Sequence, residues 1–288
     1  MNSRRNFLKL AGAGVVAAGL APVAGFSAEN QQEVQYAFKR IDSFNLGIAG
    51  YTFYKLTFEK AADIMKKVNV LNLSLKDNFL PLNSNAETIS SVIGKFRSAG
   101  INVYTVGVIY MAKAEEVENA FEYARASGVK MIVAAPNIDM LPLVVKKIKE
   151  TNIRVAIHNH GPDNTLFPTA TDIWNQIKDL DPGLGICLDI GHTTRAGQNP
   201  SVDVVRYASR IFDIHIKDVT SATKEGKTIE MGRGIIDIPG FVAALRKSKY
   251  NGMCSLEFEK DMDDPIAGIA ESIGYFKGVL RAGDVVKL

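Results

Sequence analysis

The sequence predicts an α/β protein in which eight parallel strands close into a barrel, a (β/α)8 fold. Short runs rich in Val, Ile and Leu alternate with longer amphipathic stretches, the pattern of successive βα units. Eight such runs fit into roughly 260 residues, which is the usual size of this barrel. No Gly-x-Gly-x-x-Gly follows the first run, which argues against the alternative, an open doubly wound sheet.

The expected strands are residues 46–53, 68–75, 101–110, 129–135, 154–160, 184–190, 211–216 and 253–258. The stretches between them have helical periodicity, as in TFEKAADIMKKV, and several end at glycine, which tolerates the positive φ of a helix C-terminus. No Pro/Ser-rich linker or low-complexity tract divides the chain. We therefore expect residues 29–288 to form a single barrel domain.

Residues 1–28 have a different character. Arg4-Arg5 precedes a run rich in Ala and Gly, roughly Leu10 to Gly25, that ends in small residues, the layout of a twin-arginine export signal. The run is shorter than the about 20 residues of a membrane span, and no lipobox cysteine follows it. We expect a cleaved signal and a periplasmic protein without stable membrane association; the alternative is a retained amphipathic or anchoring helix.

Charge and cysteine content narrow the partners. The signal carries three basic residues and no acid, so its removal lowers the formal net charge from +3 to zero. A balanced surface gives no electrostatic reason to expect nucleic acid as a partner, and a homo-oligomer stays open. Cys187 and Cys254 fall on opposite faces of their strands, so we expect free thiols rather than a disulfide.

Strand periodicity directs a set of polar side chains into the barrel. His158 and His160 share one strand face, and Ile157 lies on the other. The same alternation groups Cys187 with Asp189, Asp213 with His215 and Lys217, and Ser255 with Glu257 and Glu259, each set opposite large apolar residues. These polar sets lie near the carboxyl ends of the last four strands, where barrels of this type place their active sites.

Four of these residues form a mixed nitrogen and oxygen donor set on four consecutive strands: His158, Asp189, His215 and Glu257. Such a set suits one divalent transition ion, Mn²⁺, Co²⁺, Fe²⁺ or Zn²⁺, better than Mg²⁺. His160 and His192 would then contact the substrate or support the ligands, or be ordinary structural histidines. The alternative for the whole cluster is a hydrogen-bonded polar plug without a ligand.

Four motifs carry a family resemblance: Asp189-x-x-His192, His215-x-Lys217-Asp218, residues 232–237 (GRGIID) and Ser255-Leu256-Glu257. In this order and spacing, residues 45–285 resemble the sugar phosphate isomerase/epimerase group of the xylose isomerase-like TIM barrels. The resemblance implies a sugar or polyol substrate and one metal ion held by Glu, Asp, His and Glu. Asp189, His215 and Glu257 match that set, but His158 stands where such relatives have the first glutamate.

This substitution bears on the reaction. In family epimerases two metal-bound glutamates face opposite sides of the sugar and exchange its proton. A metal-bound imidazole cannot take over that role because its lone pair is already committed. The resemblance then favours an exported lyase or hydratase acting on 3-keto-glycosides, with Glu257 removing a proton next to the ketone.

The alternatives are a sugar isomerase or epimerase, and a non-catalytic sugar-binding protein. A DNA-repair endonuclease, another branch of the superfamily, is opposed by the export signal and the neutral charge. His160, His192 and Lys217 are candidates for proton delivery, and His192 and Lys217 also for substrate contact. Arg233, in the glycine-flanked loop, would close over the substrate or be a solvated surface residue.

Overall fold

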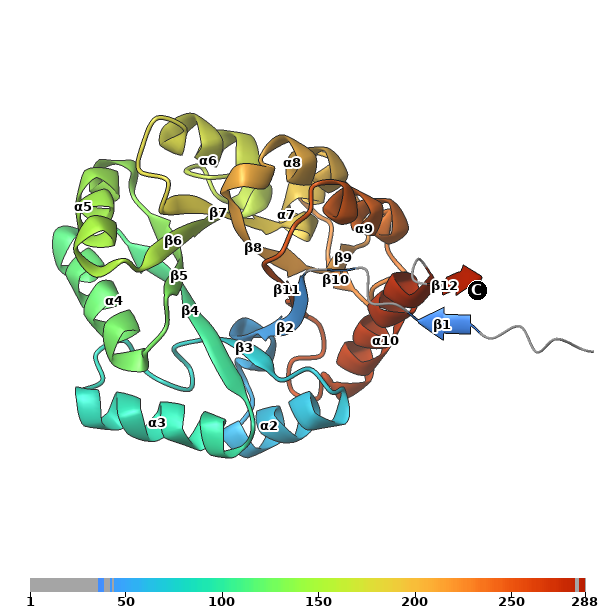
Figure 1. The fold of residues 1–288 in the computed structure, drawn as a ribbon, viewed down its shortest axis with the longest axis horizontal. Helices are drawn as coiled ribbons and strands as arrows, with labels where there is room; N and C mark the ends of the chain where they lie inside the picture. Colours follow the sequence, from blue (N-terminus) through green and yellow to red (C-terminus); the bar gives the residue numbers. More distant parts are fainter. Residues whose placement is uncertain (1–35, 39–41, 43, 283–284, 288) are drawn as a thin grey trace, which may run out of the picture. The chain divides into compact units, whose positions relative to one another are not determined.

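The computed structural model describes residues 36–38, 42, 44–282 and 285–287. The expected signal at residues 1–28 lies outside them. The barrel strands are β2 (Asn45–Ala49), β3 (Asn72–Leu75), β4 (Asn102–Met111), β5 (Met131–Pro136), β6 (Arg154–His158), β7 (Leu184–Asp189), β8 (Ile211–Ile216) and β11 (Met253–Leu256). Neighbouring strands pair in parallel, and β11 closes the barrel against β2 (Figure 1). The predicted fold class is confirmed.

Helices lie around the outside of the strands in Figure 1. They are α2 (Phe58–Lys67), α3 (Ala86–Ser98), α4 (Ala114–Ser127), α5 (Leu141–Thr151), α6 (Ala170–Ile177), α7 (Ile190–Arg195), α8 (Pro200–Arg206), α9 (Ile238–Lys247) and α10 (Ile266–Ala282). Short 3₁₀ turns are η1 (Gly50–Phe53), η2 (Ile138–Met140), η3 (Gly161–Asp163) and η4 (Ala208–Arg210). Within the described ranges, no helix is both long and apolar enough to cross a membrane.

Two pairs of short strands lie outside the barrel sheet. Strands β9 (Asp218–Val219) and β10 (Thr228–Ile229) pair antiparallel in the connection between β8 and α9. Strands β1 (Tyr36–Phe38) and β12 (Val285–Lys287) form a separate two-stranded sheet.

Several strands are shorter than their apolar runs predicted. The first ends at Ala49 because Gly50 begins a 3₁₀ turn, where a Cβ atom would lie 2.6 Å from the carbonyl oxygen of Ser74. The strand expected over 154–160 ends at His158, and Gly161 follows with a φ of 70°, a left-handed conformation that suits glycine. His160 therefore belongs to a loop and not to the strand.

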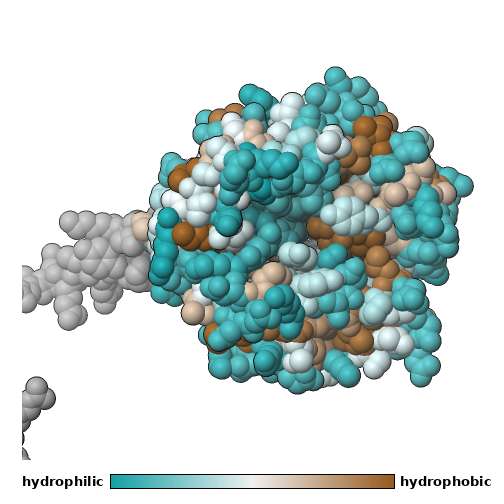
Figure 2. All heavy atoms as spheres, turned by 180° about the vertical axis from the view of Figure 1, so that it is seen from behind, coloured by the Kyte–Doolittle hydropathy of each residue, from teal (hydrophilic) through white to brown (hydrophobic). Residues whose placement is uncertain are grey.

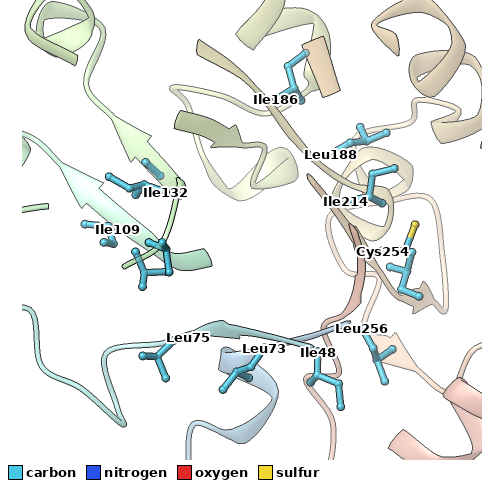
Figure 3. Packing of buried hydrophobic residues seen from close by; sticks show 14 of the residues in the cluster. Ile48, Leu73, Leu75, Ile109, Ile132, Ile186, Leu188, Ile214, Cys254 and Leu256 are labelled. Carbon is cyan, nitrogen blue, oxygen red and sulfur yellow. The ribbon is translucent and has the colours of Figure 1, made fainter. Parts of the chain in front are cut away.

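The core has two parts, which reflect the alternation of side chains along each strand. The larger part packs between barrel and helices and includes Ile186, Leu188 and Cys254 (Figure 3). The smaller part, inside the barrel, includes Ala156 and Cys187. The two cysteines thus lie on opposite faces, as predicted, and both are buried free thiols. The surface in Figure 2 is mostly hydrophilic and is hollowed near the middle of the face shown.

Candidate active site

The ends of β6 and β7 are joined by an asparagine between two histidines. Asn159 Oδ1 accepts a hydrogen bond from the backbone N–H of Asp189 at 2.9 Å, and its Nδ2 donates to Thr193 Oγ1 at 3.2 Å. The asparagine side chain is fully buried. Because it points away from the barrel interior and ties one strand end to the next, it holds His158 and Asp189 side by side.

Asp189 also caps helix α7. Its Oδ1 accepts a hydrogen bond from the backbone N–H of His192 at 2.7 Å, as an N-cap side chain does. Oδ1 is thereby fixed at the start of the helix, and Oδ2 faces His158 and Lys217. The Asp189-x-x-His192 spacing is therefore that between an N-cap residue and the third residue of its helix, and the cap hydrogen bond sets the orientation of the Asp189 carboxylate.

The four predicted ligands come together. His158 Nε2 lies 3.1 Å from His215 Nδ1, 3.5 Å from Asp189 Oδ2 and 4.0 Å from Glu257 Oε2. One donor atom from each of the four lies within 4.8 Å of the others. Four donors arranged tetrahedrally about 2.1 Å from an ion would be about 3.4 Å apart. The cluster therefore has the dimensions of a divalent metal site.

Its hydrogen bonding is also incomplete in the way that a metal site requires. All four side chains are buried, and Asp189 Oδ2, which has the Lys217 ammonium 3.1 Å away as an ion-pair partner, accepts no hydrogen bond from any described residue. The ring nitrogens that face the cluster, His158 Nε2 and His215 Nδ1, lie against each other, whereas the opposite nitrogens, His158 Nδ1 and His215 Nε2, have no hydrogen-bond partner among the described residues. Buried polar atoms without partners are uncommon in folded proteins. A bound ion would satisfy the carboxylate oxygen, so these residues fit the group that the family resemblance implies.

Lys217 is a buried residue that contacts two carboxylates of the cluster. Its Nζ lies 2.8 Å from Glu257 Oε2 and 3.1 Å from Asp189 Oδ2, and it also pairs with Glu259. Burial alone would lower the pKa of Lys217, but the three carboxylates outweigh that effect and raise the pKa well above its ordinary value. Lys217 therefore remains an ammonium and does not line the cavity described next.

A cavity of about 240 Å³ opens beside this cluster at the carboxyl end of the barrel. Its lining residues are Tyr51, Lys76, Val108, Tyr110, His158, His160, His192, Glu257 and Glu259. Four predicted site residues thus line the cavity: His158, His160, His192 and Glu257. The volume is below the ~300–1,000 Å³ of pockets for drug-sized ligands and suits a group of about one sugar ring.

Of the cavity histidines, His160 and His192 are uncharged near neutral pH. Burial, with neighbouring imidazoles adding to it, lowers the pKa of His160 to about 3. Burial lowers the pKa of His192 to about 4, although Asp189 opposes the shift. His160 Nε2 lies 3.3 Å from the Tyr110 hydroxyl, and His192 Nδ1 lies 3.3 Å from Arg195 NH1. Both rings can therefore donate or accept a hydrogen bond, but neither is poised as an imidazolium acid.

Arg233 does not reach the cavity. Its guanidinium pairs with Glu271 on α10, with NH2 2.6 Å from Oε2, and its side chain is largely exposed. The loop around it is built on Asp218, whose carboxylate accepts hydrogen bonds from the backbone N–H groups of Gly232, Gly234 and Ile236. In this structure the backbone of the GRGIID motif forms the loop around Asp218. Arg233 is a surface residue, which is the second of the two positions expected for it.

The cavity also contains residues that sequence reasoning did not select: Tyr51, Lys76, Tyr110 and Glu259. Lys76 Nζ donates to the carbonyl oxygen of Val108 at 3.0 Å and lies 3.3 Å from Asp77 Oδ1. Tyr51 is the second residue of η1, which follows strand β2. Lys76 is the first residue after strand β3. Their signal is positional, because both lie just past the carboxyl ends of barrel strands, where barrels of this type place their active sites.

Comparisons with known proteins agree with this architecture. The model of the xylose isomerase-like TIM barrel family matches residues 109–279. An inosose dehydratase of Geobacillus kaustophilus is 25% identical over 240 residues, which cover 75% of this chain and 77% of that protein. The rhizopine catabolism protein MocC of Rhizobium meliloti is 27% identical over 133 residues, and the match spans 41% of this chain and only 40% of MocC.

Among solved structures, the 3-keto-D-glucoside 4-epimerase YcjR of E. coli superimposes with a TM-score of 0.67. The superposition covers 82% of this chain and 99% of YcjR, with 16% sequence identity. At that identity the likeness concerns the fold.

Proposed function

This chain belongs to the xylose isomerase-like TIM barrel family, and we propose that it is a metal-dependent carbohydrate enzyme that removes a proton from the carbon next to a ketone. The observation that carries the proposal is the position of Glu257. Its carboxylate lines the cavity and belongs to the cluster of four metal-donor side chains. A base beside a cation site in a cavity sized for one sugar ring is the arrangement that enolisation requires.

The ion would be held by His158, Asp189, His215 and Glu257. When bound, it supplies Lewis-acid stabilisation of the negative charge that develops on the substrate carbonyl oxygen, typically worth several kcal/mol. The donor set favours Mn²⁺, Co²⁺, Fe²⁺ or Zn²⁺.

Glu257 is an anion at neutral pH, the form in which a carboxylate can accept a proton. Burial opposes its ionisation, but Lys217 and His215 beside it hold the pKa of its carboxyl well below the ordinary range. Lys217, which stays protonated, keeps the neighbouring carboxylates charged in a buried site. His160 and His192 line the same cavity and would orient the substrate through neutral ring nitrogens.

We further propose elimination rather than two-base epimerisation. Apart from Glu257, the one carboxylate among the described cavity residues is that of Glu259, and both pair with the same ammonium of Lys217. Because both carboxylates contact one ammonium, they lie close together on one side of the cavity. The opposite side therefore lacks the second carboxylate that proton exchange across a sugar ring needs. The inosose dehydratase relative, whose name denotes an elimination, favours the same class.

On a 3-keto-glucoside the reaction balances as follows. Glu257 takes the C2 proton, the C1–C2 double bond forms and the bond from C1 to the aglycone oxygen breaks. The aglycone leaves as an alcohol after taking up a proton, and the ring remains as an unsaturated keto-sugar. Epimerisation would instead return a proton to the opposite face, and it is the alternative product outcome.

We also propose that the enzyme works in the periplasm on an uncharged glycoside. The twin-arginine pattern at residues 4–5 supports export. The cations around the site are already paired: Lys217 with the carboxylates of the cluster, and Lys76 with Asp77. With a divalent ion bound, the carboxylates of Asp189, Glu257 and Glu259 balance the charges of that ion and of Lys217. No net positive charge is then left at the cluster to bind a phosphate.

Aglycone release from a panel of 3-keto-glycosides by the manganese-loaded protein tests the proposal. Glu257→Gln should bind substrate and lower turnover by about 10²- to 10⁴-fold, the usual contribution of a positioned base. Glu122→Gln, on the exposed surface of α4, is the matched control and should retain full turnover. Equal turnover by Glu257→Gln and the control would refute the role of Glu257.

A further inference from the structure

A second set of donor atoms lies directly against the four-residue cluster. Cys187 precedes Asp189 by two residues on β7 and pairs in register with His158 on β6. One ligand nitrogen of His158, one of His215 and Cys187 Sγ all lie within 4.8 Å of one another. Cys187 belongs to the core cluster inside the barrel, so this set is deeper than the one that includes the carboxylates.

Two independent features indicate that these atoms can take a ligand. His158 and His215 are 2% and 1% exposed, and each has a ring nitrogen, Nδ1 and Nε2 respectively, without a hydrogen-bond partner among the described residues. The Cys187 thiol is completely buried beside them. With metal–sulfur bonds of about 2.3 Å and metal–nitrogen bonds of about 2.0–2.1 Å, these donors would be about 3.6 to 3.8 Å apart. From the 4.8 Å limit, each pair of donors would have to approach by at most about 1.2 Å.

The two donor sets differ in chemical character. Carboxylate oxygens suit borderline and hard ions, whereas a thiolate with two imidazoles selects thiophilic ions such as Cd²⁺, Cu⁺ and Zn²⁺. The carboxylate oxygens of Asp189 and Glu257 are also the atoms that Lys217 approaches. An ion bound through Cys187 leaves both of those ion pairs intact. The deeper set therefore leaves Lys217 in place between the two carboxylates.

We propose that the barrel has a second cation-binding mode in which a thiophilic ion is held by His158, Cys187 and His215. Coordination replaces the S–H bond of Cys187 by a sulfur–metal bond and requires His215 as a neutral imidazole, so the thiol proton and the extra proton of an imidazolium at His215 both pass to solvent. Because both histidines are shared with the proposed catalytic ion, the two modes exclude each other. A thiophilic ion therefore displaces the working ion and inhibits the enzyme. The binding mode itself does not depend on the proposed reaction.

Titration of the metal-free protein with Cd²⁺ tests this proposal through the ultraviolet sulfur-to-cadmium charge-transfer band. The wild type should develop the band up to one equivalent of Cd²⁺. Cys187→Ser should lose the band, and Cys254→Ser, whose thiol lies on the outer face of β11, should keep it. Asp189→Asn should also keep it, because the carboxylate is not part of the deeper set.

Displacement is measured separately with Mn²⁺, whose free form gives a sharp paramagnetic resonance signal. One equivalent of Cd²⁺ should release one equivalent of Mn²⁺ from the wild type. The proposal is overturned if wild type saturated with Cd²⁺ shows no band, if the band survives in Cys187→Ser, or if Cd²⁺ and Mn²⁺ bind together. Should Cys187→Ser fail to fold, the wild-type band, the Cys254→Ser control and the Mn²⁺ release still decide the question. Turnover by the manganese form is assayed independently, so failure here leaves the proposed reaction testable.

Discussion

Lys217 Nζ lies 2.8 Å from Glu257 Oε2, and both side chains are almost completely buried. A buried carboxylate is stable as an anion only if a cation or several hydrogen bonds compensate its charge. Lys217 supplies that compensation for Glu257 and also for Asp189, at 3.1 Å. The relationship keeps a base ionised inside a barrel even when no divalent ion is bound.

The first prediction concerns this ammonium. Lys217→Met should lower the free energy of unfolding of the metal-free protein by about 3–5 kcal/mol, because buried carboxylates would lose their partner. Saturation with Mn²⁺ should recover part of the loss. Lys55→Met is the control, since its ion pair with Asp263 is exposed on both sides and contributes at most about 1 kcal/mol. Urea denaturation of the three proteins measures the effect, and equal losses for both variants would contradict it.

The second prediction concerns acid stability. The pKa values of His160 and His192 in the folded protein, about 3 and about 4, lie below the ~6.5 of an unfolded histidine. Their contribution to stability is therefore complete above about pH 6.5 and is lost as the pH falls toward these folded values, because the unfolded chain binds protons first. The folded pKa values of the Asp189 and Glu257 carboxyls are lowered, so their contribution to stability is lost at lower pH, below about 4.

Unfolding measured in urea from about pH 7 to about pH 4 should thus show declining stability of the metal-free wild type. Replacing either histidine by asparagine should flatten the decline. An unchanged slope in both variants would mean that these imidazoles bind protons in the folded protein as they do in the unfolded chain.

The third prediction concerns Lys76, which lines the cavity wall from the end of β3. An ammonium that binds substrate and transition state equally affects KM and leaves kcat unchanged. Lys76→Met should raise KM by about tenfold, the effect of a hydrogen bond to a charged group worth roughly 1.5 kcal/mol. Lys66→Met, on the exposed face of α2, should leave KM as it is. A matching fall in kcat would assign Lys76 to the chemical step instead.

The fourth prediction concerns export. Arg4 and Arg5 lie outside the described residues, and their role rests on the sequence pattern alone. Replacing both by lysine should leave the precursor in the cytoplasm, because the twin-arginine route reads that pair. Fractionation of cells followed by immunoblotting measures it. Periplasmic accumulation of the lysine variant would point to the general secretory route.

The cluster of four donor side chains could be predicted because strand alternation depends only on local backbone geometry. Once His158, Asp189 and Glu257 were placed on inward faces of neighbouring parallel strands, their approach followed. The sequence left open whether Arg233 closes over the substrate or lies on the surface, because its partner Glu271 lies 38 residues further along the chain. No local pattern contains such a contact.

The remaining cavity residues were hidden for a different reason. Tyr51 lies in a 3₁₀ turn within an apolar run that resembled a continuing strand. Tyr110 lies near the end of β4, and the same aromatic residue type fills strand cores elsewhere. Where each strand ends is decided by turns such as that at Gly161, and these depend on packing between loops.

The central claim is that Glu257 removes a proton from one face and that elimination follows. Product analysis by nuclear magnetic resonance after reaction of a 3-keto-glucoside in deuterated water tests it most directly. We predict released aglycone together with an unsaturated keto-sugar, and loss of both products in Glu257→Gln. An intact sugar, inverted and deuterated at one carbon, with no aglycone released from any glycoside in the panel, would contradict elimination and identify an epimerase.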